Sequence, residues 1–180
     1  DNGIVLIFDE IQTGFGRTGK MFGVEHFPGV EPDLVTLAKG IAGGFPLAAV
    51  TGREDLMDSP RESGLGTTFG ASPISCSAAL GVFEVFDNDN IISHANKQSA
   101  IMQSSLYEIQ EVSQCIGDIR GLGPMIGVEI VNDRNSKEPS KEKTNKIISL
   151  AKSKGLLLVS CGLEENVIRF MGPLTTPLEQ

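Results

Sequence analysis

The 180-residue chain lacks the sequence features of several protein classes. Its cysteines are few, odd in number and without metal-ligand spacing, so we expect reduced thiols and no metal site at Cys76, Cys115 and Cys161. Basic residues number 15 against 23 acidic ones, and the net charge of −8 argues against unaided binding to nucleic acid or to anionic membrane surfaces. No apolar run approaches the about 20 residues that a membrane-spanning helix needs.

The N-terminal residues also lack a methionine and the pattern of a signal peptide. The chain instead enters an apolar run directly after Asp1-Asn2-Gly3. We therefore expect a segment of a longer protein, located in the cytoplasm or, if the source is eukaryotic, in the mitochondrial matrix. Hydrophobic residues make up 40% and charged residues 21% of the chain, which is ordinary for a globular protein with one domain or two unequal lobes.

Apolar runs in the first half of the chain predict strands. Residues 4–8 and 34–38 are largely apolar without alternation, which is typical of strands that are buried on both faces of a parallel sheet. A third run covers residues 47–50. Residues 73–86 are rich in small and apolar side chains and predict a buried helix.

The polar segment 87–90 is a candidate boundary between two domains, residues 1–88 and residues 89–180. Helix and strand patterns alternate along the chain, so the predicted fold class is α/β. One face of a helix is predicted from the spacing of Ile91, Ala95, Met102, Leu106 and Ile109.

The rest of the second half continues this alternation. Apolar residues recur at every second position over residues 125–131, which predicts a half-covered strand. Ser140 is typical of a helix start, and Gly155 of a left-handed helix end. Short strands are predicted at residues 156–159 and 167–170.

Asp9 and Glu10 follow the first predicted strand and allow three interpretations. They resemble the acidic strand end of a P-loop ATPase, which holds Mg²⁺ and orients water. Alternatively, one carboxylate faces a cofactor at the carboxyl edge of the sheet, where open α/β folds bind ligands. Acids also commonly solvate a strand end. The glycine-containing run 11–19 is not needed by an ATPase strand, and the chain contains no G-x-x-x-x-G-K-[ST] motif.

Lys39 lies between the second predicted strand and the glycine-rich residues 40–44. Most lysines are solvated surface groups, but the flanks of this one are almost entirely apolar. Desolvation lowers the proton affinity of an amine, and the neutral amine is the form that attacks an aldehyde. Pyridoxal phosphate (PLP) requires a lysine for its aldehyde and an acid for its ring nitrogen, and Asp9 with Lys39 would supply both.

Several segments together resemble the class III aminotransferase family, closest to its 4-aminobutyrate branch. The resemblance implies a fold-type I PLP-dependent transferase: residues 1–88 form the latter part of the large, mostly parallel-sheet domain, and residues 89–180 form a small C-terminal domain truncated at its end. It extends over essentially the whole chain and rests on residues 9–19, 32–34, 38–44, 66–73, 120–129, 160–162, 166–170 and 173–175.

The resemblance also implies roles for single residues. Asp9 would keep the pyridine nitrogen of PLP protonated, Ile11 would pack against the ring, and Gln12 would bind the ring hydroxyl oxygen. Lys39 would form the Schiff base (aldimine) and then move a proton. Thr68 would bind the cofactor phosphate in the partner's site of a homodimer; a cap before a helix is the alternative.

Arg169 would bind a substrate carboxylate through two hydrogen bonds, although a structural ion pair is a common alternative for an arginine in a strand. The implied reaction is ping-pong transfer of an ω-amino group from a small-molecule donor similar to 4-aminobutyrate to the 2-oxo acid 2-oxoglutarate. Thr67 is more typical of acetylornithine-type members, so acetylornithine, ornithine and diaminobutyrate are alternative donors. A catalytically silent chain that still folds or associates is a further alternative.

Overall fold

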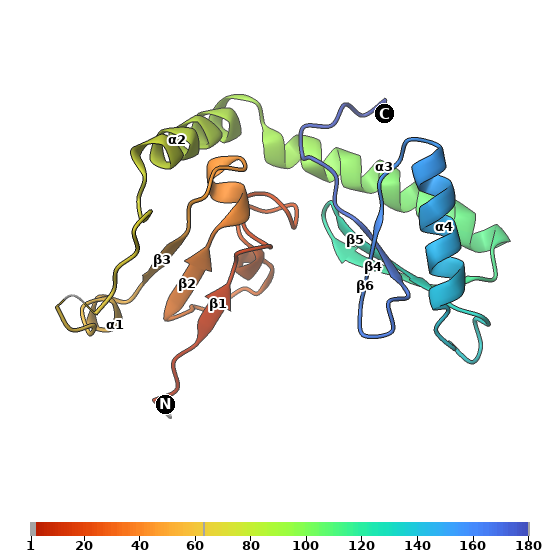
Figure 1. The fold of residues 1–180 in the computed structure, drawn as a ribbon, viewed down its shortest axis with the longest axis horizontal. Coiled ribbons are helices and arrows are strands. Elements are labelled where there is room, and N and C mark those ends of the chain that lie inside the picture. Colours follow the sequence, from red (N-terminus) through yellow and green to blue (C-terminus); the bar gives the residue numbers. More distant parts are fainter. Residues whose placement is uncertain (1–2, 63, 180) are drawn as a thin grey trace. The chain divides into compact units, whose positions relative to one another are not determined.

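The computed structural model describes residues 3–62 and 64–179, and the chain divides into two compact units. Unit 1 comprises Asp1–Ile92 and unit 2 comprises Ser93–Gln180 (Figure 1). The last two residues of unit 1 already belong to helix α3 (Ile91–Val112), which continues into unit 2. A domain boundary between residues 88 and 89 stays a prediction.

Unit 1 contains a three-stranded sheet in the order β1-β2-β3. Strand β1 (Ile7–Asp9) is parallel to β2 (Leu34–Leu37), and β3 (Ala49–Gly52) is antiparallel to β2. The sequence therefore located all three strands, with limits that differ by up to three residues. The helices of unit 1 are η1 (Gly23–His26), η2 (Lys39–Ala42), α1 (Glu54–Met57) and α2 (Pro73–Asn88).

Within the described residues, these elements are not buried on both faces. Ile4, which precedes β1, is 81% exposed, and Ile7 of β1 is 54% exposed. Strand β1 lies at one edge of the sheet. Helix α2 packs against η2, but only Ser75 and Ala79 of α2 are buried. A continuous apolar run indicates a strand with two apolar faces. It does not show which parts of a protein cover those faces.

Asp33 joins the ends of all three strands of unit 1. Its carboxylate accepts hydrogen bonds from the backbone N–H of Leu6 (2.7 Å) and from Nη1 of Arg53 (2.7 Å). The backbone N–H of Arg53 also donates to the carbonyl oxygen of Asp33 (2.9 Å). The Leu6 N–H, and next the Arg53 guanidinium, hold the pKa of the Asp33 carboxyl below its ordinary value.

This lowered pKa predicts a pH-dependent contribution to stability. The folded state binds a proton at Asp33 less readily than the unfolded state, so the contribution is complete above the ordinary carboxyl pKa of about 4 and is lost as the pH falls through the lower, folded pKa. We expect Asp33→Asn to lower the melting temperature at about pH 6, and the difference from wild type to narrow as the pH approaches about 2. Thermal melts of both proteins across this range measure it.

Asp55→Asn is the matched control for this prediction. It removes the other carboxylate that Arg53 binds, at 2.7 Å, and leaves the Leu6 bond in place. A melting-temperature difference for Asp33→Asn that stays constant from about pH 6 to pH 2 would mean that the carboxylate charge is not what stabilises the strand ends.

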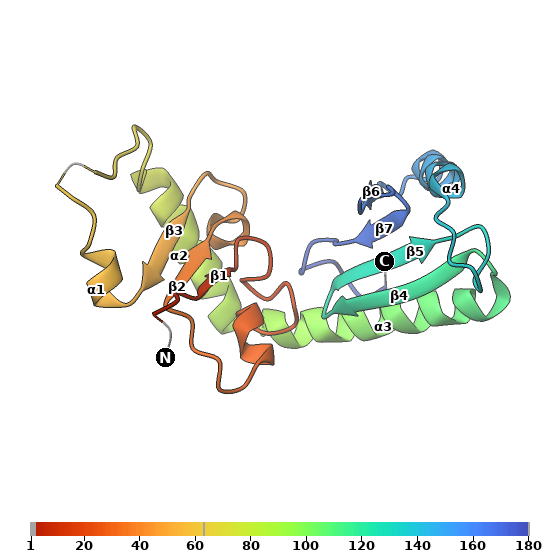
Figure 2. The same ribbon diagram turned by 90° about the horizontal axis from the view of Figure 1, so that it is seen from below.

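Unit 2 contains a four-stranded antiparallel sheet in the order β4-β5-β7-β6. Helix α3 runs along one face of this sheet (Figure 2). Both α3 and α4 contribute to the core, which Met102 of α3 and Ile147 of α4 contact. The remaining elements are β4 (Ile116–Leu122), β5 (Met125–Ile130), α4 (Lys141–Ser153), β6 (Val159–Cys161) and β7 (Val167–Phe170).

The predicted alternation along β5 is confirmed, because its alternate residues at 126, 128 and 130 are all buried in the core cluster. The predicted helix is present as α3, but Ile109 is 51% exposed and does not share the buried face of Leu106. Gly155 has a positive φ of 85°, as predicted for a helix end, and Ser140 occupies the N-cap position of α4. No helix in the described ranges is both long and apolar enough to cross a membrane.

Candidate functional site

Asp9 and Lys39 lie at the same edge of the unit 1 sheet. Strands β1 and β2 are parallel and paired so that Asp9 is opposite Thr36, which places both carboxyl ends together. Oδ1 of Asp9 accepts hydrogen bonds from the Ile11 N–H and from the hydroxyl of Thr36, each 3.1 Å long. Lys39 is the first residue of η2, two residues beyond the end of β2. The geometry thus brings an oriented carboxylate and a lysine to one edge.

The backbone of Lys39 adopts a left-handed conformation, with φ +44°. Residues other than glycine hold this conformation at a cost of about 1–3 kcal/mol, so the surroundings must impose it. The side chain is exposed. The apolar neighbours of Lys39 were expected to desolvate its amine. The described residues do not do so, because Leu37 and Ile41 pack in the core of unit 1 while the side chain of Lys39 is exposed.

The other predicted cofactor residues occupy two places in unit 1. Ile11 and Gln12 are half-buried and follow Asp9 and Glu10 in the sequence. Thr68 is exposed in the turn 67–70, in which the Gly70 N–H donates to the Thr67 carbonyl (3.2 Å). Burial lowers the pKa of the Arg17 guanidinium in the same loop as Gln12.

Glu10 is a site residue to which the sequence assigned no role. It is 1% exposed, and its carboxylate accepts hydrogen bonds from the backbone N–H groups of Gly23 (2.9 Å) and Val24 (2.7 Å) and from the hydroxyl of Thr13. Because successive strand residues face opposite sides, Asp9 points to the exposed side and Glu10 points inward. The sequence feature that marks Glu10 is a second acid at a strand end, followed by a glycine-containing loop.

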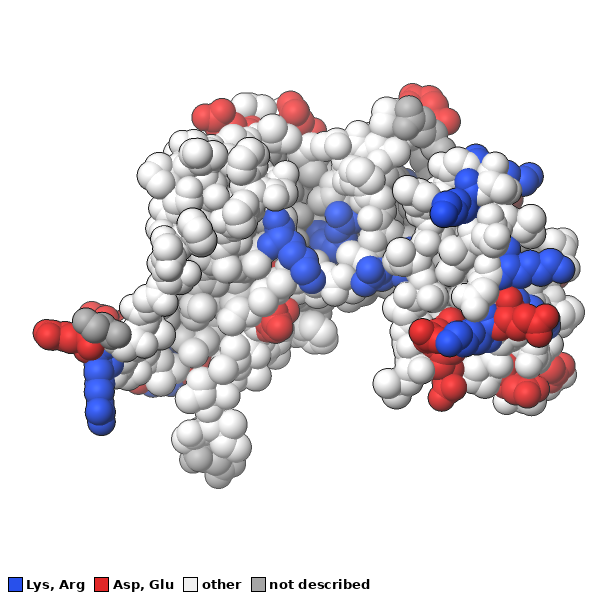
Figure 3. All heavy atoms as spheres, viewed as in Figure 1, with Lys and Arg blue, Asp and Glu red and all other residues white. Residues whose placement is uncertain are grey.

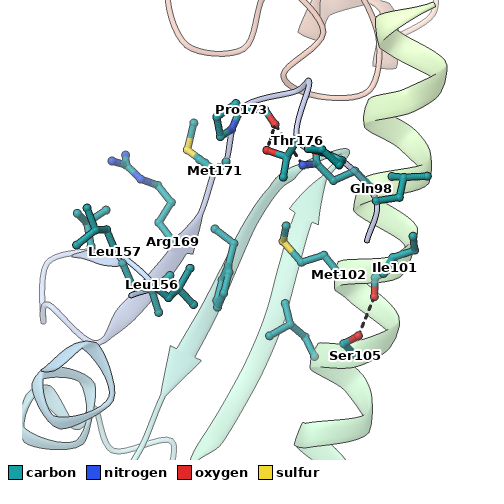
Figure 4. Close-up of a pocket in the computed structure, with 17 residues that line it drawn as sticks. Gln98, Ile101, Met102, Ser105, Leu156, Leu157, Arg169, Met171, Pro173 and Thr176 are labelled. Atoms are coloured by element: carbon teal, nitrogen blue, oxygen red, sulfur yellow. Dashed lines mark hydrogen bonds between the residues drawn. The ribbon is translucent and has the colours of Figure 1, made fainter. Parts of the chain in front are cut away.

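Arg169 lies in unit 2, on β7, opposite Gly127 of β5 and Val159 of β6. It lines a pocket of about 740 Å³ within this unit. Its Nε atom is buried, and so is Oε1 of Gln98; neither has a hydrogen-bond partner among the described residues. Figure 4 shows Arg169 beside Leu157 at one end of the pocket.

The segment 171–178 also lines this pocket and is hydrogen-bonded to α3. Nε2 of His94 donates to the Thr176 carbonyl (2.8 Å), and Nε2 of Gln98 donates to the Pro173 carbonyl (3.2 Å). Most of the lining is apolar, including Met102 on α3 and Leu156 before β6 (Figure 4). An arginine at the end of an apolar pocket is suited to an anionic group with a hydrocarbon body.

Comparisons with known proteins identify the family of the chain. The family model for aminotransferase class-III matches residues 1–180. The chain is 47% identical over 175 residues to 4-aminobutyrate aminotransferase of Escherichia coli, covering 97% of this chain and 41% of that protein. It is 44% identical over 176 residues to 5-aminovalerate aminotransferase of Pseudomonas aeruginosa, covering 98% of this chain and 41% of that protein.

A solved structure of an aminotransferase from Bacillus anthracis superposes with a TM-score of 0.88 at 32% identity, covering 98% of this chain and 42% of that one. The chain thus spans about two fifths of the length of the relatives that it matches. The expected α/β fold of fold-type I is confirmed, and the P-loop ATPase interpretation is excluded. The chain belongs to the class-III aminotransferase family.

Proposed function

We propose that this chain is part of a PLP-dependent aminotransferase, with Lys39 as the residue that holds the cofactor covalently. The observation that carries the proposal is the placement of Asp9 and Lys39 at the common carboxyl edge of two paired parallel strands. Ligands of open α/β sheets bind at this edge. The chain includes no cluster of three or more His, Cys, Asp or Glu side chains suited to a metal within the described residues.

The residues at this edge fit PLP. The carboxylate of Asp9 is exposed and oriented by two donors, so it is accessible to a protonated ring nitrogen. Lys39 is also exposed, and its amine would attach the cofactor and then carry a proton to and from the substrate carbon. Ile11 would pack on the ring and Gln12 would bind the ring hydroxyl oxygen. PLP when bound supplies an electron sink for the substrate.

The proposed amino donor is an ω-amino acid similar to 4-aminobutyrate, and the proposed acceptor is 2-oxoglutarate, in a ping-pong reaction. The support is the identity to relatives named for 4-aminobutyrate and 5-aminovalerate. Such donors carry a carboxylate at one end of a short hydrocarbon chain and an amine at the other. Arg169 would bind that carboxylate. Acetylornithine, ornithine and diaminobutyrate remain alternative donors of the same reaction class.

We also propose that the active protein is a cytoplasmic homodimer and is longer than this chain. Thr68 is exposed, which suits a hydroxyl that binds the cofactor phosphate in the partner's site. In the view of Figure 3, the surface over the unit 1 sheet and α2 is mostly uncharged. Exposed apolar side chains of unit 1 include Ile4, Ile7, Ile74, Leu80 and Phe83.

The experiment compares the full-length protein with a polypeptide of residues 1–180 alone. The full-length protein with PLP should form glutamate from 4-aminobutyrate and 2-oxoglutarate. The shorter polypeptide should bind PLP weakly, form no glutamate and sediment as associated or aggregated material, because exposed apolar patches beyond a few hundred Å² favour association.

Two results would contradict the proposal. A full-length protein that produces no glutamate from any of the four donors would favour a catalytically silent protein. A soluble monomer of residues 1–180 that turns over would contradict both the dimer and the need for further residues.

A further inference from the structure

The loop 11–24, which joins β1 to η1 and includes the first two residues of η1, packs closely around Glu10. Two glycines approach this residue closely: a Cβ at Gly14 would lie 2.9 Å from the Glu10 carbonyl oxygen, and a Cβ at Gly23 would lie 3.0 Å from Glu10 Oε2. The Glu10 N–H donates to the Thr36 carbonyl of β2 (3.0 Å), and its carbonyl accepts from the Gly14 N–H (3.0 Å). Glu10 therefore ties the whole loop to the strand pair.

The same loop presses against the residue that follows Lys39. Phe15 is 5% exposed, and a Cβ at Gly40 would lie 3.0 Å from the Cβ of Phe15. The aromatic ring of Phe15 is held by Phe22, with ring centroids 5.8 Å apart. Ile41 is buried in the same cluster. The first turn of η2 therefore packs directly against the loop.

These contacts explain how the costly backbone conformation of Lys39 is maintained. A residue with φ +44° persists only where its neighbours determine its position, and the Phe15–Gly40 contact lies one residue away. The backbone of Asp9 is held by its register in β1, and its carboxylate accepts from Thr36 of β2 as well as from Ile11 at the start of the loop. The position of Lys39 relative to Asp9 therefore depends on the loop, and the loop depends on the buried carboxylate of Glu10.

We propose that Glu10 is a positioning residue, which acts through the loop 11–24 and the Phe15–Gly40 contact to fix Lys39 relative to Asp9. This inference rests on the proposed function. It predicts that loosening the loop slows the steps in which Lys39 takes part, and leaves the binding of the substrate carboxylate in unit 2 unchanged. A misplacement of about 1 Å in such a group costs about 10²-fold in rate.

The test uses the full-length protein with PLP and the variant Glu10→Gln. Glutamine keeps the size of the side chain but places an amide N–H₂ against backbone N–H donors. We expect kcat per bound PLP to fall by about 10- to 100-fold, with KM for 4-aminobutyrate and 2-oxoglutarate within about twofold of wild type. The fraction of bound PLP that borohydride fixes on Lys39 should also fall. Glu25→Gln is the control, since Glu25 also accepts a backbone N–H, from Phe22 at 2.7 Å, but is exposed.

A second variant, Gly40→Ala, approaches the same contact from the Lys39 side and keeps every hydrogen bond of Glu10. Gly40→Ala should reproduce the loss of kcat at constant KM. If Glu10→Gln does not fold, Gly40→Ala alone tests whether the contact between the loop and η2 fixes Lys39. Variants that melt at lower temperature but keep the wild-type kcat per bound PLP would overturn the inference, because Glu10 would then be structural only. A wild-type protein that fixes no PLP on Lys39 would instead refute the proposed function.

Discussion

Replacing Lys39 by alanine in the full-length protein will abolish measurable turnover while PLP still binds without a covalent bond. Loss of a proton-transferring side chain alone lowers a rate by about 10²- to 10⁴-fold, and loss of the covalent attachment adds to this. The exposed position of Lys39 on η2 means that the substitution removes no buried packing. Steady-state glutamate formation and the visible absorbance of the bound cofactor measure the two effects.

Lys20→Ala is the matched control for this experiment. Lys20 lies in the loop that begins after Asp9, and its Nζ donates to the carbonyl oxygen of Glu25 (2.6 Å). Its removal should leave turnover near that of wild type. Comparable losses in the two variants would indicate that loop damage, rather than the amine of Lys39, accounts for the effect.

Arg169→Ala should weaken the use of both carboxylate substrates. Removing one member of a buried, hydrogen-bonded charge pair costs about 2–5 kcal/mol, or about 30- to 5,000-fold in kcat/KM. The loss should appear mainly as a higher KM for 4-aminobutyrate and 2-oxoglutarate. The spectrum of bound PLP should not change, because the role proposed for Arg169 is to bind the substrate carboxylate and not the cofactor.

Arg120→Ala provides the comparison. Arg120 lies on β4 opposite Gly127, the same residue that Arg169 faces from β7, but it is paired with Asp118 at 2.8 Å and Glu129 at 3.6 Å. Its removal should change KM little. An Arg169→Ala protein with normal KM values, or one that loses PLP, would assign Arg169 a structural role.

The sequence was sufficient for the parts of the fold that depend on local pattern. Apolar runs located β1 and β2, and because parallel neighbours end at one edge, Asp9 and Lys39 were expected together. The alternation over residues 125–131 placed the correct face of β5 in the core. These features depend on how apolar residues are spaced along a strand, and this spacing can be read from a single sequence.

The limits of the short strands depend on partners far along the chain and were not predictable. Strand β6 begins at Val159, not at residue 156, because pairing starts where Val159 meets Arg169 of β7. Leu156 and Leu157 are apolar yet exposed, since they follow the left-handed turn at Gly155.

The role of Glu10 was hidden for the same reason. Its backbone partners, Gly23 and Val24, lie 13 and 14 residues further along the chain. A second acid at a strand end before a glycine-containing loop marks the position, but this pattern does not show whether the carboxylate is solvated or turns inward to bind the loop. The left-handed conformation of Lys39 was equally hidden, because it depends on Phe15 meeting Gly40.

Borohydride reduction of the PLP-loaded full-length protein, followed by peptide mapping, shows directly which lysine holds the cofactor. We expect a single reduced pyridoxyl group, on the peptide that contains Lys39. The same label on Lys20, Lys97 or any other lysine, with Lys39 unmodified, would contradict it.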